Sequence, residues 1–290
     1  MTGPLGATDH RLDEHTSLRI GGPADFYVRA RSEDDLLGAI KVAREHELPV
    51  FILGGGTNLL VSDRGIRGVV LHNGWSETQV DGTTVTAASG TPLASVAAVA
   101  ARSGIAGLEW MATVPGTVGG AIHGNAGAFG SDTADALVDA TLVDLNGDVW
   151  TQDRGSLAYS YRTSALQGTP IICLRARFRG VSGDRAVAVA KIKEMANQRI
   201  AKQPLAQPNT GSIFRNPEGD HAGRLIEAAG LKGVRIGGAQ VSEKHANFIV
   251  NTGDATAADV WALMQRCMAA VKERFSIELV PEVERVGEWS

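Results

Sequence analysis

Three polar side chains could do chemistry by type, although none is diagnostic alone. Arg162 follows Tyr161 in the segment YRTS, and a planar guanidinium has the geometry that pairs with a carboxylate. Ser212 lies in GSIFRNP, and it lacks the GxSxG elbow that marks an acyl nucleophile. Glu282 is a single carboxylate near the C-terminus. Taken one at a time, these residues have ordinary interpretations as a surface charge, a turn serine and an unremarkable terminal acid.

A cluster of glycines gives a more specific signal. The chain holds 35 glycines, and Gly54-Gly55-Gly56-Thr57-Asn58 directly follows the apolar run Val50–Leu53. Consecutive glycines let backbone N–H groups surround an anion without intervening side chains. The cluster lacks the third glycine of GxGxxG and the GK[ST] of a P-loop. It therefore predicts either a phosphate contact of another type or a tight turn that simply needs glycine.

A second glycine-rich stretch runs from Val114 to Gly130 and contains VPGTVGG and NAGAFG. Small residues at these positions let backbone pass close to a flat or phosphorylated group, although a turning loop would also need them. Two such stretches reinforce each other, because a dinucleotide with two phosphates and two aromatic ends needs several such surfaces. The residues that the two stretches offer to a cofactor are Gly54, Gly55, Gly56, Thr57, Asn58, Leu59, Pro115, Gly116, Gly119, Gly120, Asn125, Ala126 and Gly127.

Composition excludes several classes of function. The net charge is −4 and no dense Lys/Arg block occurs, which argues against nucleic acid as a partner. The two cysteines, Cys173 and Cys267, lie in apolar runs without metal-ligand spacing, so we expect buried, reduced thiols and no metal site. Met1–His10 lacks the apolar core of an export signal, and no apolar run is long enough to span a bilayer. These features predict a cytoplasmic protein without membrane insertion.

The order of strand and helix signals favours an α+β fold over a doubly wound sheet. We expect helices that begin near Ser32, at Thr91-Pro92 and at Thr256, with Thr91 capping the second of them. Asn146-Gly147 predicts a hairpin turn, and a composition shift near 180–184 indicates a domain boundary. Further segments are predicted as strands at 26–28, 50–53, 69–71, 85–88, 140–143, 149–151, 171–177 and 277–280, and as helices at 187–199 and 222–229.

In this order, the motifs resemble those of the UDP-N-acetylenolpyruvoylglucosamine reductase (MurB) family. They are LGGGTNLL, VPGTVGGA with NAGAFG, YSYRTS, GSIFRNP, AGRLIEAAGLKG, VSEKHANFIVN and LVPEV. The resemblance extends from about His15 to Gly287, and GSIFRNP followed by GLKG and PEV is its most specific part. The chain has no long insert near Tyr161 and so resembles the type II branch.

The resemblance implies a two-domain FAD-binding unit of the vanillyl-alcohol-oxidase (PCMH) type, with subdomains at 1–71 and 72–183. A C-terminal α+β substrate-binding domain at 184–290 would follow, its last strand returning toward the flavin. The resemblance also implies tightly bound FAD and NADPH as hydride donor. The reduced flavin would then reduce the enolpyruvyl group of UDP-N-acetylglucosamine enolpyruvate, giving UDP-N-acetylmuramate for peptidoglycan synthesis.

Residue roles follow from the same motifs. The resemblance implies that Arg162 and Glu282 are catalytic and that Ser212 is the proton donor. It further implies that the substrate-binding residues are Tyr161, Asn216 and His245. One position departs from the pattern, because Glu284 stands where many relatives carry Arg or Lys. That departure puts a phosphate contact from this segment in doubt, without affecting Glu282.

Two other functions stay open at this point. The glycine stretches alone would equally suit an FAD-dependent oxidase of a small alcohol or sugar, although the C-terminal motifs argue against it. A sensor that binds a nucleotide-sugar without turning it over would be expected to lack one of the three catalytic side chains, and none is missing.

Overall fold

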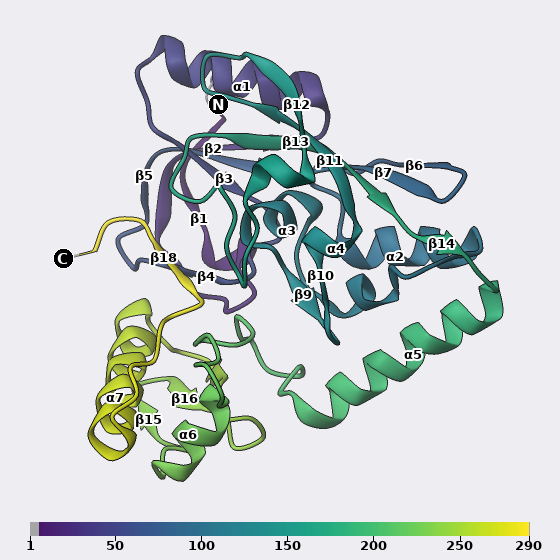
Figure 1. Cartoon of the computed structure of the whole chain (residues 1–290). Coiled ribbons are helices and arrows are strands. Elements are labelled where there is room, and N and C mark those ends of the chain that lie inside the picture. The colour runs from purple at the N-terminus through teal and green to yellow at the C-terminus, as the bar shows by residue number, and fades with distance from the viewer. Residues whose placement is uncertain (1–5, 290) are drawn as a thin grey trace. The chain divides into compact units, whose positions relative to one another are not determined.

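A computed structural model describes residues 6–289 of the chain (Figure 1). The first five residues and Ser290 lie outside this description, so the lack of an export signal in Met1–His10 stays a sequence prediction. The chain forms two units. The first contains Phe26–Gly55 and Gly68–Arg199 together with the N-terminal segment to Ala7, and the second contains Thr8–Asp25, Gly56–Arg67 and Ile200–Ser290. The predicted three-domain division, at 1–71, 72–183 and 184–290, stays a prediction.

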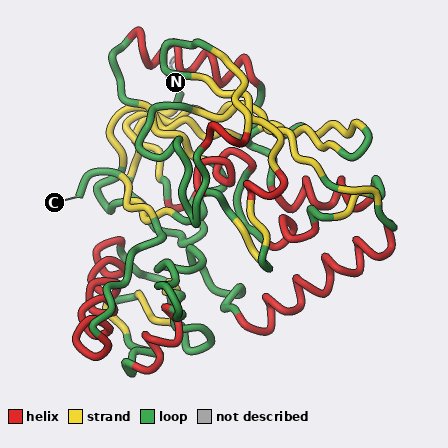
Figure 2. The backbone as a smooth tube through the Cα atoms, viewed as in Figure 1, coloured by secondary structure: helices red, strands yellow, loops and turns green. Residues whose placement is uncertain are grey.

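Helices and strands both contribute substantially, as Figure 2 shows, and the predicted α+β class is confirmed. The α-helices are α1 (Glu33–Glu45), α2 (Leu93–Arg102), α3 (Val118–Gly124), α4 (Thr133–Ala136), α5 (Arg185–Lys202), α6 (Ala222–Ala228) and α7 (Ala257–Phe275). Short 3-10 helices are η1 (Asp13–His15), η2 (Glu109–Thr113) and η3 (Arg154–Leu157). The strands are β1 (Ala7–Arg11), β2 (Pro23–Ala30), β3 (Val50–Leu53), β4 (Leu59–Val61), β5 (Ile66–Asn73), β6 (Thr78–Asp81), β7 (Thr84–Ala88), β8 (Ile105–Ala106), β9 (Gly127–Ala128), β10 (Ser131–Asp132), β11 (Leu137–Val143), β12 (Val149–Asp153), β13 (Ile172–Arg179), β14 (Val181–Ser182), β15 (Arg235–Ile236), β16 (Ala239–Val241), β17 (Ile249–Asn251) and β18 (Glu284–Val286).

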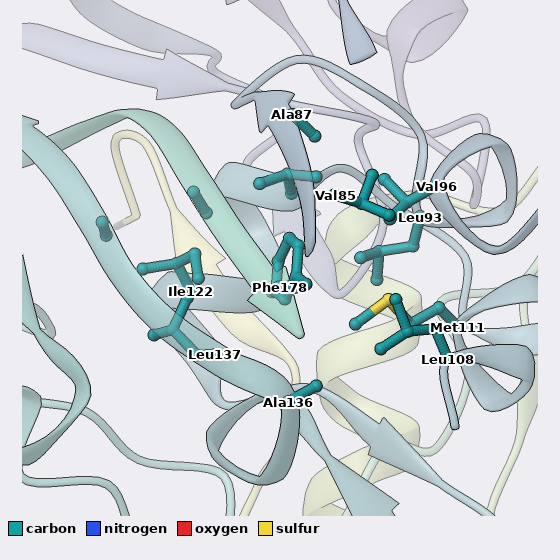
Figure 3. Close-up of a cluster of buried hydrophobic side chains, with 14 of the residues drawn as sticks. Val85, Ala87, Leu93, Val96, Leu108, Met111, Ile122, Ala136, Leu137 and Phe178 are labelled. Atoms are coloured by element: carbon teal, nitrogen blue, oxygen red, sulfur yellow. The ribbon is translucent and has the colours of Figure 1, made fainter. Parts of the chain in front are cut away.

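An antiparallel sheet of order β12-β11-β13-β7-β6 organises the first unit. From Leu174 to Arg179 alternate residues of β13 are buried, so one face of this part of the sheet packs into the core. Phe178 on β13 packs into a cluster with Val96 of α2 and Ile122 of α3 (Figure 3). The predicted hairpin at Asn146-Gly147 is confirmed, since β11 and β12 pair across it and Gly147 has φ 92°. This core fixes α3, which lies within the second glycine-rich stretch, between VPGT and NAGAFG.

A second sheet, of order β1-β2-β5-β3, leads into the first glycine motif. Strands β3 and β5 pair in parallel, and Leu53 at the end of β3 opposes His72. Helix α1 begins where predicted, because the Ser32 side chain accepts the N–H of Asp35 as an N-cap. The apolar stripe of α1 packs in a cluster with Trp75 and Leu174. The chain therefore leaves β3 from a rigid base and enters the glycine loop.

The second unit is built on the antiparallel sheet β15-β16-β17 and on helices α6 and α7. Helix α7 begins with the predicted capping box, in which Thr256 and Asp259 exchange side-chain-to-backbone bonds. Asp63 adds to this cap, since its carboxylate accepts the N–H groups of Ala257 and Ala258 at 2.8 and 3.0 Å. The C-terminal strand β18 pairs in parallel with β4, which follows the first glycine motif.

Two local predictions are wrong. The Thr91 hydroxyl does not cap α2, because it bonds both backbone groups of Glu77, at 3.0 and 3.1 Å, and Pro92 takes the N-cap position. The last strand lies at Glu284–Val286 and not at 277–280. The apolar run at 277–280 suggested a strand, but β4 offers its ladder of hydrogen bonds to the later segment.

Candidate active site

Consecutive backbone N–H groups of the first glycine motif lack acceptors. Within residues 6–289, the N–H groups of Gly55, Gly56, Thr57 and Asn58 donate to no protein atom. Gly56 and Asn58 have left-handed backbones, with φ 63° and 59°, and left-handed residues are part of the backbone nests that bind anions. A run of donors without acceptors in the protein fits a phosphorylated group such as FAD.

The two glycine stretches meet within the first unit. A Cβ added to Gly55 would lie 3.1 Å from the Cα of Gly116, and one added to Gly54 would lie 2.7 Å from Oγ1 of Thr117. Gly54 and Gly55 are therefore required by the approach of one loop to the other. Pro115 and Gly120 stay exposed beside this junction, and Gly116 is half-buried. The prediction that the two stretches act together thus has a geometric basis, although cofactor contact by each residue stays a prediction.

The motif of Asn125 predicted a cofactor contact, but its side chain bonds other parts of the protein. It is 1% exposed, and its amide nitrogen donates to Asp132 and to the carbonyl of Ser160, at 3.0 and 2.9 Å. Its amide oxygen accepts the N–H of Ala134 at 3.0 Å. Gly127 likewise serves the protein, since an added Cβ would lie 2.5 Å from the carbonyl of Ser131. The NAGAFG motif is thereby tied to the segment that precedes Arg162.

Arg162 is held at the tip of a tight turn. Ser160 and Thr163 exchange two backbone hydrogen bonds of 3.1 and 3.0 Å, and Arg162 between them has φ 56°. The guanidinium donates to the carbonyl oxygens of Gly127 at 3.0 Å and Asn125 at 3.4 Å, and its carbon lies 5.1 Å from the ring centroid of Tyr161. The two backbone carbonyls help to orient the guanidinium.

The backbone segments that carry Ser212 and Glu282 run side by side in the second unit. The N–H of Glu282 donates to the carbonyl of Ile213, the residue after Ser212, at 2.9 Å. Phe214 and Pro281 form an antiparallel bridge, so GSIFRNP and PEV run side by side. Both Ser212 and Glu282 are half-buried. Two of the three predicted catalytic side chains are therefore carried by hydrogen-bonded neighbours, and Arg162 belongs to the first unit.

Asn247 is a supporting residue that sequence reasoning missed. Its side chain is 3% exposed and bonds Phe214 twice, accepting the N–H at 3.1 Å and donating to the carbonyl at 2.8 Å. Its own carbonyl accepts the N–H of Ile213 at 3.0 Å. The only signal in the sequence was an amide within VSEKHANFIVN, a motif quoted for its resemblance alone. Asn247 fixes the backbone directly after Ser212.

The three predicted substrate contacts differ in their surroundings. Tyr161 is 52% exposed, whereas the Asn216 side-chain oxygen accepts the N–H of Ala222 at 3.1 Å. His245 is half-buried, and its Nδ1 accepts the N–H of Asn247 at 3.2 Å. Burial lowers the pKa of His245, so the neutral ring with hydrogen on Nε2 is favoured. Contact of these residues with substrate stays a prediction.

Both cysteines are buried in hydrophobic clusters. Burial raises the pKa of Cys173 and of Cys267 to about 12, so both free thiols are protonated, as predicted for buried core cysteines. Among residues 6–289, no group of three or more His, Cys, Asp or Glu side chains could hold a metal ion. No helix in that part of the chain is long and apolar enough to cross a membrane.

The chain is an FAD-binding protein, since residues 24–152 match the FAD binding domain family. Residues 203–286 match the C-terminal domain of UDP-N-acetylenolpyruvoylglucosamine reductase. UDP-N-acetylenolpyruvoylglucosamine reductase 2 of Symbiobacterium thermophilum is 46% identical to this chain, and the match covers 95% of this chain and 90% of that protein. The enzyme of Caldanaerobacter subterraneus subsp. tengcongensis is 44% identical over 96% of this chain and 92% of its own length.

A solved structure agrees with these relatives. The crystal structure of UDP-N-acetylenolpyruvylglucosamine reductase (MurB) from Thermus caldophilus aligns with a TM-score of 0.81 at 33% identity, covering 95% of this chain and 97% of that one. The chain belongs to the UDP-N-acetylenolpyruvoylglucosamine reductase family. The resemblance seen in the motifs is thereby confirmed.

Proposed function

We propose that this chain reduces the enolpyruvyl group of UDP-N-acetylglucosamine enolpyruvate to UDP-N-acetylmuramate, with NADPH as reductant and Arg162, Ser212 and Glu282 as catalytic residues. The observation that carries the proposal is the hydrogen bond between Glu282 and Ile213, because it sets the two proton-handling segments side by side in a member of this family. This reaction supplies a precursor of peptidoglycan.

The glycine loops supply the cofactor site in this proposal. The free N–H groups at Gly55–Asn58 fit phosphate oxygens, and the exposed backbone at Pro115 and Gly120 lies beside the junction of the two loops. FAD, when bound, supplies the two-electron chemistry that passes hydride from NADPH to the substrate. The first two domains of the predicted division, 1–71 and 72–183, would hold this cofactor, and the third, 184–290, the nucleotide-sugar.

Arg162 acts on the charge that develops during reduction. Hydride added to the terminal carbon of the enolpyruvyl double bond leaves an electron pair that spreads into the adjacent carboxylate. A guanidinium that is already oriented by Asn125 and Gly127 stabilises this charge without further reorganisation. The planar fork of a guanidinium matches the two oxygens of a carboxylate.

Ser212 and Glu282 complete the addition. Ser212 donates its hydroxyl proton to the carbon beside the carboxylate, so that the double bond gains one hydride and one proton. A neutral serine is a weak acid in water, so the transfer needs a strongly basic carbon held within hydrogen-bond reach. Glu282 shares a proton with the enolate oxygen. The proposed location is the cytoplasm, where NADPH and nucleotide-sugars are available.

Anaerobic spectroscopy tests the proposal. The purified protein should be yellow, NADPH should bleach its flavin, and UDP-N-acetylglucosamine enolpyruvate should restore the colour with formation of one UDP-N-acetylmuramate per flavin. Glucose and simple alcohols serve as controls and should leave oxidised flavin unchanged. A flavin that NADPH bleaches but that the enolpyruvyl substrate cannot reoxidise would overturn the proposal.

A further inference from the structure

The side chain of Asn58 lies against the segment that carries Glu282, although its motif predicted a cofactor contact. Its amide nitrogen donates to the carbonyl oxygen of Glu282 at 3.1 Å. Its own backbone carbonyl accepts the N–H of Glu284 at 2.9 Å. Asn58 therefore holds the chain on both sides of Val283.

Both main-chain polar groups of Glu282 are hydrogen-bonded. The N–H of Glu282 donates to Ile213 in the serine segment, and its carbonyl is bonded by Asn58 in the glycine loop. Beyond Glu284 the parallel ladder between β18 and β4 takes over, with Glu284 opposite Leu59. Glu282 precedes the first residue of that ladder. Its carbonyl is bonded instead by the side-chain amide of Asn58.

Asn58 also belongs to the run of unpaired N–H groups. Its φ of 59° is a left-handed conformation that asparagine and glycine adopt more readily than most residues. Its own N–H has no acceptor within residues 6–289 and follows those of Gly55, Gly56 and Thr57. The backbone N–H of Asn58 thus belongs to the proposed anion site, and its side-chain amide donates to the backbone carbonyl of Glu282, the predicted catalytic glutamate.

We propose that Asn58 is the positioning residue of Glu282, and that through Asn58 an anion bound at the Gly55–Asn58 loop fixes the placement of the Glu282 carboxylate. The proposal rests on the function proposed above, and it assigns to Asn58 a role in the substrate half of the reaction. The bonds to its N–H and to its carbonyl restrain the main chain from which the Glu282 side chain projects. Filling the anion site restrains the loop, and the amide passes that restraint to Glu282.

Hydrogen exchange tests the link without reference to turnover. Loading the apoprotein with FAD should slow amide exchange in the peptide that spans 279–286. The same loading should have a much smaller effect in Asn58→Gly, which keeps the positive φ and removes the amide. Asn146→Gly, a turn substitution in the β11–β12 hairpin, should behave as wild type, and exchange in α7 reports whether each variant is folded. Equal FAD protection of 279–286 in wild type and Asn58→Gly would overturn the proposal.

Separate half-reactions test the consequence for catalysis. At saturating FAD, Asn58→Gly should be reduced by NADPH at close to the wild-type rate. Its reoxidation by the enolpyruvyl substrate should be slower by on the order of a hundredfold, because misplacing a catalytic group by about 1 Å has effects of that size. Equal slowing of both half-reactions would show that Asn58 acts only as a cofactor contact, and it would contradict the proposal.

Asn58→Asp provides a chemical rescue. Its carboxylate cannot donate to the Glu282 carbonyl, but the protonated acid can. The reoxidation rate of Asn58→Asp relative to Asn58→Gly should therefore rise as pH falls toward about 4, the ordinary pKa of aspartate. A ratio that does not change with pH would count against the hydrogen bond. If the wild type itself is not reoxidised by the substrate, the proposed function fails, while the exchange experiment still decides the role of Asn58.

Discussion

The backbone N–H of Glu282 donates to the carbonyl oxygen of Ile213 at 2.9 Å, one residue after Ser212. This bond joins two segments that are distant in the sequence and that carry the proposed proton donor and the proposed acid. The buried side chain of Asn247 also bonds the main chain of Phe214, so the backbone of the Ser212 segment is held by Glu282 and by Asn247. We therefore expect substitutions in the site to affect the two half-reactions differently.

Replacing Arg162 by lysine should slow substrate reduction while keeping the positive charge. The guanidinium donates to two carbonyl oxygens, and its planar fork matches a carboxylate in a way that the point charge of an ammonium does not. We expect reoxidation of the flavin by substrate to fall by about 10²–10³-fold, the usual effect of losing one donor to a developing charge. Stopped-flow absorbance measures this rate directly.

Arg154→Lys is the matched control for that substitution. Arg154 begins η3 in the same unit and is exposed. It should reoxidise at the wild-type rate. An Arg162→Lys protein that matches this control in both half-reactions would remove Arg162 from the catalytic residues.

Replacing Asn125 should destabilise the first unit, and alanine should do so more than glycine. Both substitutions remove the three bonds of the buried amide and leave the buried N–H of Ala134 without its acceptor, at a cost of about 1–3 kcal/mol for a buried group. Asn125 has φ 46°, which costs alanine roughly another 1 kcal/mol and costs glycine nothing. Urea unfolding of the two variants gives the difference. Equal stability, or a more stable alanine variant, would contradict the role of the left-handed backbone.

His245 predicts a specific dependence of stability on pH. Burial lowers its pKa in the folded state, so the unfolded chain binds a proton at higher pH than the folded chain does. The stability that this neutral ring contributes is fully present above about pH 6.5, the ordinary pKa of histidine, and is lost as pH falls through the lowered value. The unfolding free energy should therefore fall less steeply between pH 7 and 5 in His245→Gln than in wild type. A steeper fall in the variant would reverse the assigned sign.

Local signals in the sequence predicted much of the fold. Ser32 and Thr256 cap helices as expected, and Asn146-Gly147 turns a hairpin, because each of these structures depends on residues adjacent in the chain. Thr91 failed as a cap because its hydroxyl found Glu77, a partner that no local pattern reveals. The C-terminal strand was misplaced for the same reason, since β4 decides where it pairs.

The site shows the same division between local and long-range information. The glycine motif predicted backbone donors without side chains, and the family motifs predicted which polar residues act in the site. They did not reveal that the amides of Asn58 and Asn125 are directed at the Glu282 carbonyl and at the turn of Arg162. Those partners come from segments far apart in the sequence, so only the folded chain identifies them.

The most direct test of the account is the pair of half-reactions in Ser212→Ala, measured anaerobically by stopped-flow absorbance with the wild type alongside. Flavin reduction by NADPH should proceed at the wild-type rate, because Ser212 has no part in it. Reoxidation by UDP-N-acetylglucosamine enolpyruvate should slow by about 10²–10⁴-fold, the usual contribution of a positioned general acid. Reoxidation at the wild-type rate, or equal slowing of both steps, would contradict the assignment of Ser212 as the proton donor beside Glu282.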